Sequence, residues 1–213
     1  MEIFILLINI LGLLSNPGFT HAEPENGDLI FQESCTGEVG KAIKGVTNSI
    51  DNYNFTHVGI VHINENGEIS VIEATPPKVK VTPLDEYLKP PKDNCKPKSV
   101  VARLKPQYRH LIPAAIEEAL KLTGKDYDYA FILGDDNYYC SELIYEIFLK
   151  ANDNSPLFHL NVMTFKNQDT GIFLDEWVKY YQNLGTEIPE GEMGINPGAM
   201  SRAEVLDILY ELY

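Results

Sequence analysis

A predicted β-hairpin sets the strongest limit on how this chain folds. Residues 55–63 and 68–74 are two runs rich in Val and Ile that flank Asn64-Glu65-Asn66-Gly67. An Asn-Gly pair between such runs is typical of a tight turn between antiparallel strands. Three more segments are predicted strands, the second with the alternating Lys and Val of an exposed sheet edge: residues 28–32, 78–82 and 99–104.

Helical periodicity marks most of the remaining chain. Five helices are predicted, at residues 39–46, 83–88, 113–122, 140–150 and about 174–183. Residues 152–200 are otherwise expected to be mostly irregular. Ser201 is placed to cap a last helix, with Glu204 at the capping-box position.

The composition predicts one acidic globular domain. Lys and Arg number 17 against 31 Asp and Glu, a formal net charge of −14 in 213 residues. Nucleic acids and anionic membranes repel such a surface, so neither is an expected partner. The 12 Tyr and 9 Phe, with no low-complexity tract, exclude collagen, coiled-coil and disordered classes. No repeat or linker divides the chain.

The first 22 residues read as a cleaved signal peptide. Residues 3–14 are almost wholly apolar but shorter than the roughly 20 residues that span a bilayer. Thr20-His21-Ala22 offers small residues before a cut at Glu23. Residues 23–213 are then expected as a single exported domain, periplasmic or extracellular, with no stable membrane insertion. An uncleaved anchor is the alternative.

Three cysteines leave at least one thiol unpaired within the chain. Cys35 and Cys95 both lie in polar, loop-like sequence, and a disulfide between them is plausible in an exported protein. Cys140 is then the free thiol, and it begins the predicted helix 140–150. The positive end of a helix dipole favours the nucleophilic thiolate, whereas Asp135 and Asp136 oppose it.

The length of the hairpin loop decides whether a histidine and a carboxylate meet. A two-residue loop, Asn66-Gly67, places Glu73 opposite Ile60 and away from His57. A three-residue loop with Gly67 left-handed places Glu73 opposite Gly59 instead. Glu73 is then a diagonal neighbour of His57 on the same face, close enough to orient its ring.

A Cys140-His57-Glu73 relay is therefore one interpretation of these residues. In it the backbone N–H of Cys140 holds the oxyanion. The alternative is structural: a buried small thiol, a core histidine and a surface ion pair. No spacing of Cys, His, Asp and Glu suggests a metal site, and residues 191–198 do not form a nucleotide-binding glycine motif, so no cofactor is expected.

A set of ordered motifs resembles one known family. The motifs are Gly27-Asp28-Leu29-Ile30-Phe31, Thr56-His57-Val58-Gly59-Ile60-Val61, Val71-Ile72-Glu73-Ala74, Gly124-Lys125-Asp126-Tyr127-Asp128, Tyr138-Tyr139-Cys140-Ser141-Glu142-Leu143 and Asn196-Pro197-Gly198. Together they resemble the permuted papain-like amidases of the YiiX/YaeF type, in the NlpC superfamily of cysteine peptidases. The His-Glu hairpin precedes the Cys helix here, the reverse of the ordinary papain order, which matches that permutation.

The resemblance implies a fold, a reaction and a site. The fold is α+β: a small antiparallel, barrel-like sheet packed against the helix that carries the nucleophilic cysteine. Cys140 is the implied nucleophile, His57 the base and Glu73 the third residue, while Tyr139 and Ser141, on either side of Cys140, are candidate substrate-binding residues. Residues 152–200 are the family's variable region near the cleft.

The implied function is hydrolysis of an amide bond through a thioester acyl-enzyme. The substrate class is a small amide, a peptide or an N-acyl compound. Two alternatives stay open. One is an acyltransferase with a lipid acyl donor, favoured if residues 152–200 form an apolar channel. The other is a non-catalytic module that binds amide or amino-acid ligands on the same fold.

Overall fold

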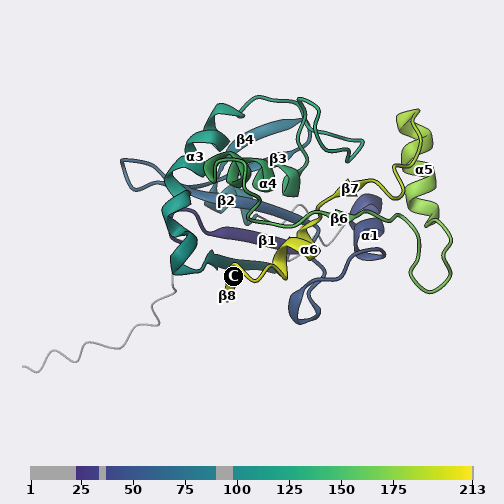
Figure 1. Cartoon of the computed structure of the whole chain (residues 1–213), viewed down its shortest axis with the longest axis horizontal. Helices are drawn as coiled ribbons and strands as arrows, with labels where there is room; N and C mark the ends of the chain where they lie inside the picture. Colours follow the sequence, from purple (N-terminus) through teal and green to yellow (C-terminus); the bar gives the residue numbers. More distant parts are fainter. Residues whose placement is uncertain (1–22, 34–36, 90–97, 213) are drawn as a thin grey trace, which may run out of the picture.

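A six-stranded sheet forms the centre of the molecule. The computed structural model describes residues 23–33, 37–89 and 98–212. Its strands follow the order β4-β3-β2-β1-β5-β8, and every neighbouring pair is antiparallel (Figure 1). The strands are β1 (Leu29–Glu33), β2 (His57–Ile63), β3 (Ile69–Thr75), β4 (Lys78–Pro83), β5 (Lys98–Leu104) and β8 (Leu206–Leu212). All five predicted strands are present, with β4 at an edge as expected.

The hairpin between β2 and β3 has the three-residue loop. Ile60 pairs with Ile72 and Val61 with Val71, which sets Glu73 opposite Gly59. Gly67 has a φ of 80°, a left-handed conformation that favours glycine. The Asn64 N–H donates to the Glu68 carbonyl at 3.1 Å, which closes the loop. The register that the catalytic interpretation requires is therefore confirmed.

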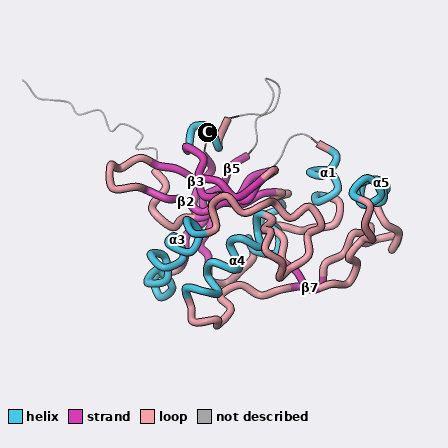
Figure 2. Tube along the Cα trace, turned by 90° about the horizontal axis from the view of Figure 1, so that it is seen from above, coloured by secondary structure: helices cyan, strands magenta, loops and turns pink. Residues whose placement is uncertain are grey.

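Helices cover both faces of the sheet. α3 (Ile112–Lys121) and α4 (Cys140–Ala151) lie on the same side of it (Figure 2). The apolar stripe of α4 packs into one core with β2 and β3, made by Leu143, Ile144, Ile147, Phe148, Val58, Ile60, Ile72 and Ala74. On the opposite face, Tyr87 of α2 (Leu84–Tyr87) packs in a second core beside Val61 and Val71. The predicted α+β fold, with the sheet packed against the cysteine helix, is confirmed.

A third apolar cluster lies beyond one end of the sheet. There α1 (Glu38–Lys44) lies near α5 (Asp175–Leu184) (Figure 1). Buried residues of this cluster include Ala42, Val46, Trp177 and Tyr181. The segment 152–200 that connects α4 to this region also contains the short strand pair β6 (Asn161–Val162) and β7 (Met193–Gly194), and α6 (Pro197–Ser201). Two 3₁₀ turns complete the described elements, at Ile50–Asn52 and Pro106–Leu111.

The predicted last helix is wrong. Ser201 ends α6, and its hydroxyl donates to the Gly198 carbonyl and accepts from the Ile50 N–H, so it caps no following helix. Glu204 lies before strand β8, which pairs with the edge of β5. Strand β5 would otherwise present a row of unpaired backbone groups, and pairing them favours the extended form over a helix.

Some predictions fall outside the described residues. These are the signal peptide at 1–22 and the disulfide between Cys35 and Cys95. Within the described part of the chain, Cys140 is a free, buried thiol. No helix there has the length and apolar character needed to cross a membrane.

Candidate active site

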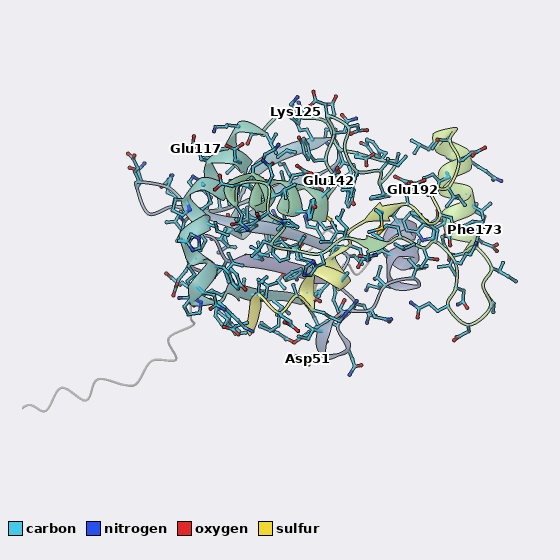
Figure 3. The ribbon with its side chains drawn as sticks, viewed as in Figure 1. Asp51, Glu117, Lys125, Glu142, Phe173 and Glu192 are labelled. Carbon is cyan, nitrogen blue, oxygen red and sulfur yellow. The ribbon has the colours of Figure 1, made fainter. Side chains whose placement is uncertain are left out.

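The N-terminus of α4 holds Cys140 in a fixed position. Glu142, in the first turn, accepts hydrogen bonds from the backbone N–H groups of Tyr139 and Gly134, both at 3.2 Å. Its side chain lies among packed neighbours, in contrast to Glu117 and Lys125 at the periphery (Figure 3). Burial raises the pKa of Glu142 to about 8, and nearby acidic groups add to this. The carboxyl group thus ties the preceding loop to the start of the helix.

His57 and Glu73 form a short, mostly buried pair. His57 Nε2 donates to Glu73 Oε2 at 2.6 Å, and Glu73 is only 5% exposed. Gly59 lies between them on the same sheet face, and a Cβ there would approach Val71 Cγ1 at 2.4 Å. Glycine at this position therefore leaves room for the two strands to bring the carboxylate and imidazole together.

The imidazole also meets the thiol. Cys140 is close enough to His57 to raise the pKa of the imidazole, and because Nε2 is bonded to Glu73, Nδ1 is the ring nitrogen left to face the sulfur. Burial lowers the pKa of His57, but its hydrogen bonds and charge interactions with Cys140 and Glu73 outweigh burial and raise the pKa to about 10. The structure therefore brings the three predicted residues together, and the interactions of His57 with Cys140 and Glu73 favour a protonated imidazole.

Glu73 is held from its far side by β4. Thr82 Oγ1 donates to Glu73 Oε1 at 2.6 Å, and Lys80 Nζ lies 3.7 Å from the same oxygen. Burial raises the pKa of Glu73, but the bonds to His57 and Thr82 and the charges of His57 and Lys80 outweigh it and lower the pKa. The carboxylate is therefore ionised and fixed on both oxygens.

Tyr87 completes the surroundings of His57. Its ring centroid is 5.9 Å from that of the imidazole, and its hydroxyl donates to the Ile30 carbonyl at 2.9 Å. Sequence reasoning missed Thr82 and Tyr87 as neighbours of the site. For Thr82 a signal existed, because the alternation of residues 78–82 puts it on the same face as Lys80. For Tyr87 none did, since its position depends on how α2 folds over the sheet.

Tyr139 and Ser141 connect the cysteine helix to the chain near β7. Ser141 Oγ donates to the Ile195 carbonyl at 2.9 Å, and the Tyr139 hydroxyl accepts from the Ile195 N–H at 3.2 Å. Both residues are buried and line the pocket beside Cys140. Their polar groups are already bonded within the protein, so their part in substrate binding stays a prediction.

Two pockets lie on either side of the thiol–imidazole pair. The first has a volume of about 80 Å³ and includes Cys140 in its lining, with residues of α1, α5 and segment 161–165. The second, of about 380 Å³, includes His57 and Glu73 but not Cys140. Thr56 and Tyr127 line both, so the pockets are neighbours. Cys140 and His57 therefore lie at the boundary between the two pockets.

Replacing Thr82 with valine tests how far the carboxylate depends on β4. Thr82→Val keeps the side-chain shape but removes a hydrogen bond to a buried ionised oxygen. The free energy of unfolding is expected to fall by about 1–3 kcal/mol in urea titrations near neutral pH. The pKa of Glu73 rises without this donor, so the acidic limb of a pH–stability curve moves to higher pH. Thr123→Val, at an exposed position, is the matched control; equal curves for the two variants contradict the role of Thr82.

No metal cluster accompanies this site. Within residues 23–33, 37–89 and 98–212, no group of three or more His, Cys, Asp and Glu side chains is arranged to hold a metal ion. His57 Nε2 is bonded to Glu73, and the ring also interacts with the neighbouring Cys140. The donor set suits proton transfer between side chains and does not fit a metal-binding cage.

Comparisons with known proteins agree with this fold. A model of the family described as permuted papain-like amidase enzyme, YaeF/YiiX, C92, matches residues 23–210. The protein YiiX of Escherichia coli K12 is 32% identical over 152 residues, which cover 69% of this chain and 67% of YiiX. A crystal structure of metalloprotein YiiX from Escherichia coli O157:H7 matches with a TM-score of 0.69 and 25% identity, over 89% of this chain and 98% of that one. The chain therefore belongs to the permuted papain-like amidase family of the YaeF/YiiX type, a family of cysteine hydrolases.

Proposed function

We propose that this protein hydrolyses an amide bond through a thioester acyl-enzyme, with Cys140, His57 and Glu73 as its catalytic triad. One observation supports the proposal: the imidazole of His57 is hydrogen-bonded to the Glu73 carboxylate and lies beside the thiol of Cys140 at the start of a helix. A nucleophile, a base and a residue that orients the base are the parts that covalent acyl transfer to sulfur requires.

The first half-reaction forms the thioester. The Cys140 sulfur attacks the amide carbon, and the oxyanion is stabilised by the backbone N–H of Cys140, which has no helical carbonyl partner in the first turn of α4. The His57 imidazolium then gives its Nδ1 proton to the leaving nitrogen, so the C–N bond breaks and an amine departs. Glu73 keeps Nδ1 directed at the reacting atoms through its bond to Nε2.

The second half-reaction returns the enzyme to its starting state. Neutral His57 takes a proton from water, the hydroxide adds to the thioester carbon, and the Cys140 sulfur leaves as the acid forms. The His57 side chain is 19% exposed, so solvent reaches the ring from the side of the second pocket. This exposure favours water as the acyl acceptor.

Acyl transfer is the second candidate, and one observation favours it. Segment 152–200 contributes apolar side chains to the pocket beside Cys140, although the acyltransferase alternative predicts an apolar channel formed by this segment. In that reaction an amine or alcohol replaces water in the second step, and the same three residues serve. Product analysis with and without added amines separates the two reactions.

The metal-binding description of the Escherichia coli O157:H7 relative enters no step of this mechanism. The described side chains of this chain provide no cluster for a metal ion, as set out above. An expected location outside the cytoplasm is also part of the proposal. The family match begins at residue 23, directly after the predicted cleavage point, which supports a leader that is separate from the catalytic domain.

Alkylation of the thiol across pH tests the proposal before any substrate is known. Iodoacetamide is expected to modify Cys140 faster than an ordinary thiol at pH 5–7, because the positive charge of the neighbouring His57 imidazolium stabilises negative charge on the reacting sulfur. His57→Ala removes the imidazolium, so the rate below pH 7 falls at least tenfold. Peptide mass spectrometry locates the label.

Two controls accompany the alkylation experiment. His110→Ala removes a surface histidine on the 3₁₀ turn 106–111, and its labelling rate is expected to equal that of the unmodified protein. Labelling of the denatured chain gives the rate of an unperturbed thiol. If Cys140 reacts in the native protein no faster than in the denatured chain at pH 6, the catalytic proposal is wrong and the binding module becomes the better interpretation.

A further inference from the structure

The second pocket is the space into which the leaving amine extends. His57 gives its proton to the leaving nitrogen, and His57 and Glu73 line this pocket whereas Cys140 does not. Groups attached to that nitrogen therefore lie along the pocket wall. The volume of about 380 Å³ is within the range of roughly 300–1,000 Å³ that is usual for small-molecule sites. This placement rests on the proposed function.

Four aromatic side chains form part of the wall of this pocket. They are Tyr127, Tyr129, Phe131 and Tyr180. The ring centroids of Tyr127 and Tyr129 are 5.1 Å apart with an interplanar angle of 77°, and those of Phe131 and Tyr180 are 6.0 Å apart with an angle of 33°. Tyr129 is 41% exposed, so its ring is accessible to a ligand. The face of an aromatic ring is electron-rich and attracts cations.

Hydrogen bonds from α5 hold the aromatic wall in place. The Tyr180 hydroxyl donates to the Tyr129 carbonyl at 2.8 Å, which ties α5 to the loop that contains Tyr129 and Phe131. The hydroxyl of the next residue, Tyr181, donates to the Ala130 carbonyl of the same loop at 2.9 Å. The rings are therefore arranged before a ligand arrives, which reduces the entropy lost on binding.

The charged groups of the lining leave the aromatic wall free of positive charge. Among the described lining residues there is no Lys or Arg, and the ionisable pair is His57 with Glu73. The His57 imidazolium and Lys80, whose Nζ lies 3.7 Å from Glu73, place positive charge close to the triad. A cationic ligand group is repelled there. It is therefore expected against the rings, separated from the leaving nitrogen by a short spacer.

A buried carboxylate lies beside the same rings. Asp128 is only 4% exposed and accepts hydrogen bonds from two backbone N–H groups of its own loop, at 2.6 and 2.7 Å. Burial raises the pKa of Asp128, and these two bonds oppose the rise. Burial and the charge of Asp128 together raise the pKa of Tyr180 to about 12, so the two side chains interact. The carboxylate adds negative potential to the aromatic wall.

We infer that the leaving amine of the substrate has a second, positively charged nitrogen, an alkylammonium or quaternary ammonium group, which binds against the rings of Tyr127, Tyr129, Phe131 and Tyr180. Cation–π attraction favours such a group over a neutral group of the same shape. Burial of hydrocarbon alone favours the neutral group, because it is less strongly hydrated. A charged ligand and its neutral isostere therefore distinguish the two kinds of recognition.

The test compares choline with 3,3-dimethylbutan-1-ol, its neutral isostere, as inhibitors of Cys140 acylation. p-Nitrophenyl acetate acylates the sulfur and releases p-nitrophenol, whose absorbance gives the rate, and mass spectrometry locates the acetyl group. A molecule in the second pocket competes with the nitrophenyl group for space. At constant ionic strength the inhibition constant of choline is expected to be about tenfold lower than that of the neutral alcohol. Ethanolamine, compared with propan-1-ol, reports whether a primary ammonium group is also bound.

Substitutions at Tyr129 test the role of the aromatic wall. Tyr129→Leu removes one ring, and the preference for choline is expected to fall at least threefold. Tyr129→Phe retains the ring and the preference. Ile132→Ala, on the same loop, also 41% exposed and outside both pockets, is the matched control and keeps the wild-type preference. Because the preference is a ratio of two inhibition constants, a change in the acylation rate itself cancels.

The outcomes separate failure of this inference from failure of the proposed function. Equal inhibition by the two alcohols, stronger inhibition by the neutral one, or no inhibition by either overturns the cation site and leaves the hydrolase proposal standing. An unchanged preference in Tyr129→Leu overturns the assignment to the aromatic wall. If p-nitrophenyl acetate does not acylate Cys140, the hydrolase proposal itself is wrong, and this inference fails with it.

Discussion

Cys140→Ala is expected to reduce amide turnover by at least about 10⁴-fold. Removal of the nucleophile from a covalent mechanism leaves only substrate binding and the oxyanion donor, because no thioester forms. The measurement is steady-state release of amine from an amide substrate. Mass spectrometry of wild-type protein quenched during turnover detects the acylated peptide that contains residue 140, and the variant gives none.

The fold of the Cys140→Ala variant serves as its internal control. Cys140 is 6% exposed beside the first turn of α4, and loss of one sulfur atom leaves only a small hole. Its melting temperature is expected to lie within a few degrees of the wild-type value. Cys35→Ala, under reducing conditions, removes a thiol that belongs to no predicted site and retains turnover. Residual activity of Cys140→Ala above about 10% exposes a different nucleophile and refutes the thioester route.

Glu73→Gln is expected to lower kcat by about 10²-fold or more and to shift the pH profile. The carboxylate raises the pKa of His57 through its hydrogen bond and charge. Its replacement by a neutral amide lowers that pKa, so the imidazolium is lost at lower pH and the basic limb of the kcat profile moves down. KM is expected to change less than kcat, because Glu73 acts through His57 and not on the substrate.

The effect of Glu73→Gln on the free energy of unfolding depends on pH, and its sign follows from the shifted pKa values of His57 and Glu73. The raised pKa of His57 stabilises the native state fully below pH 6.5, and this contribution is lost as pH rises toward about 10. The lowered pKa of Glu73 stabilises the native state above pH 4.5 and less as pH falls below it. The wild-type advantage over Glu73→Gln is therefore greatest near pH 5–6.5.

Glu117→Gln is the matched control for the Glu73 experiments. It removes one negative charge from an exposed position on α3, where Glu117 pairs with Lys121. Exposed pairs of this kind contribute little, so its pH profile and stability are expected to match the wild type. If the basic limb of the kcat profile does not move in Glu73→Gln, Glu73 is not part of the triad, whatever the effect of the substitution on stability.

The sequence predicts the geometry best in the β2–β3 hairpin, where strand alternation and the length of one loop determine how His57 and Glu73 are placed. Alternation along residues 55–63 placed His57 and Gly59 on one face, and only the loop length separated the two possible positions of Glu73. Sequence left both registers open because Asn66-Gly67 suits a two-residue turn as well as a three-residue loop. The left-handed backbone of Gly67 resolves the choice in the structure.

Long-range contacts account for what sequence reasoning did not find. Sequence reasoning predicts a last helix capped by Ser201, but residues 206–212 form a strand because the edge of β5, which is distant in sequence, pairs with them. Tyr87 reaches His57 only because α2 folds over the sheet. The pocket wall in segment 152–200 likewise depends on its packing against α1, which local sequence patterns do not encode.

The permuted order of elements has a consequence for how reactivity arises during synthesis. The hairpin with His57 and Glu73 leaves the ribosome well before Cys140. Ile195, which is hydrogen-bonded to Tyr139 and Ser141 beside Cys140, leaves later still. An incomplete chain thus contains an imidazole–carboxylate pair and, at most, an ordinary, weakly nucleophilic thiol. The sulfur gains its activating partner only when nearly the whole polypeptide has been made, so an incomplete chain is expected to resist acylation.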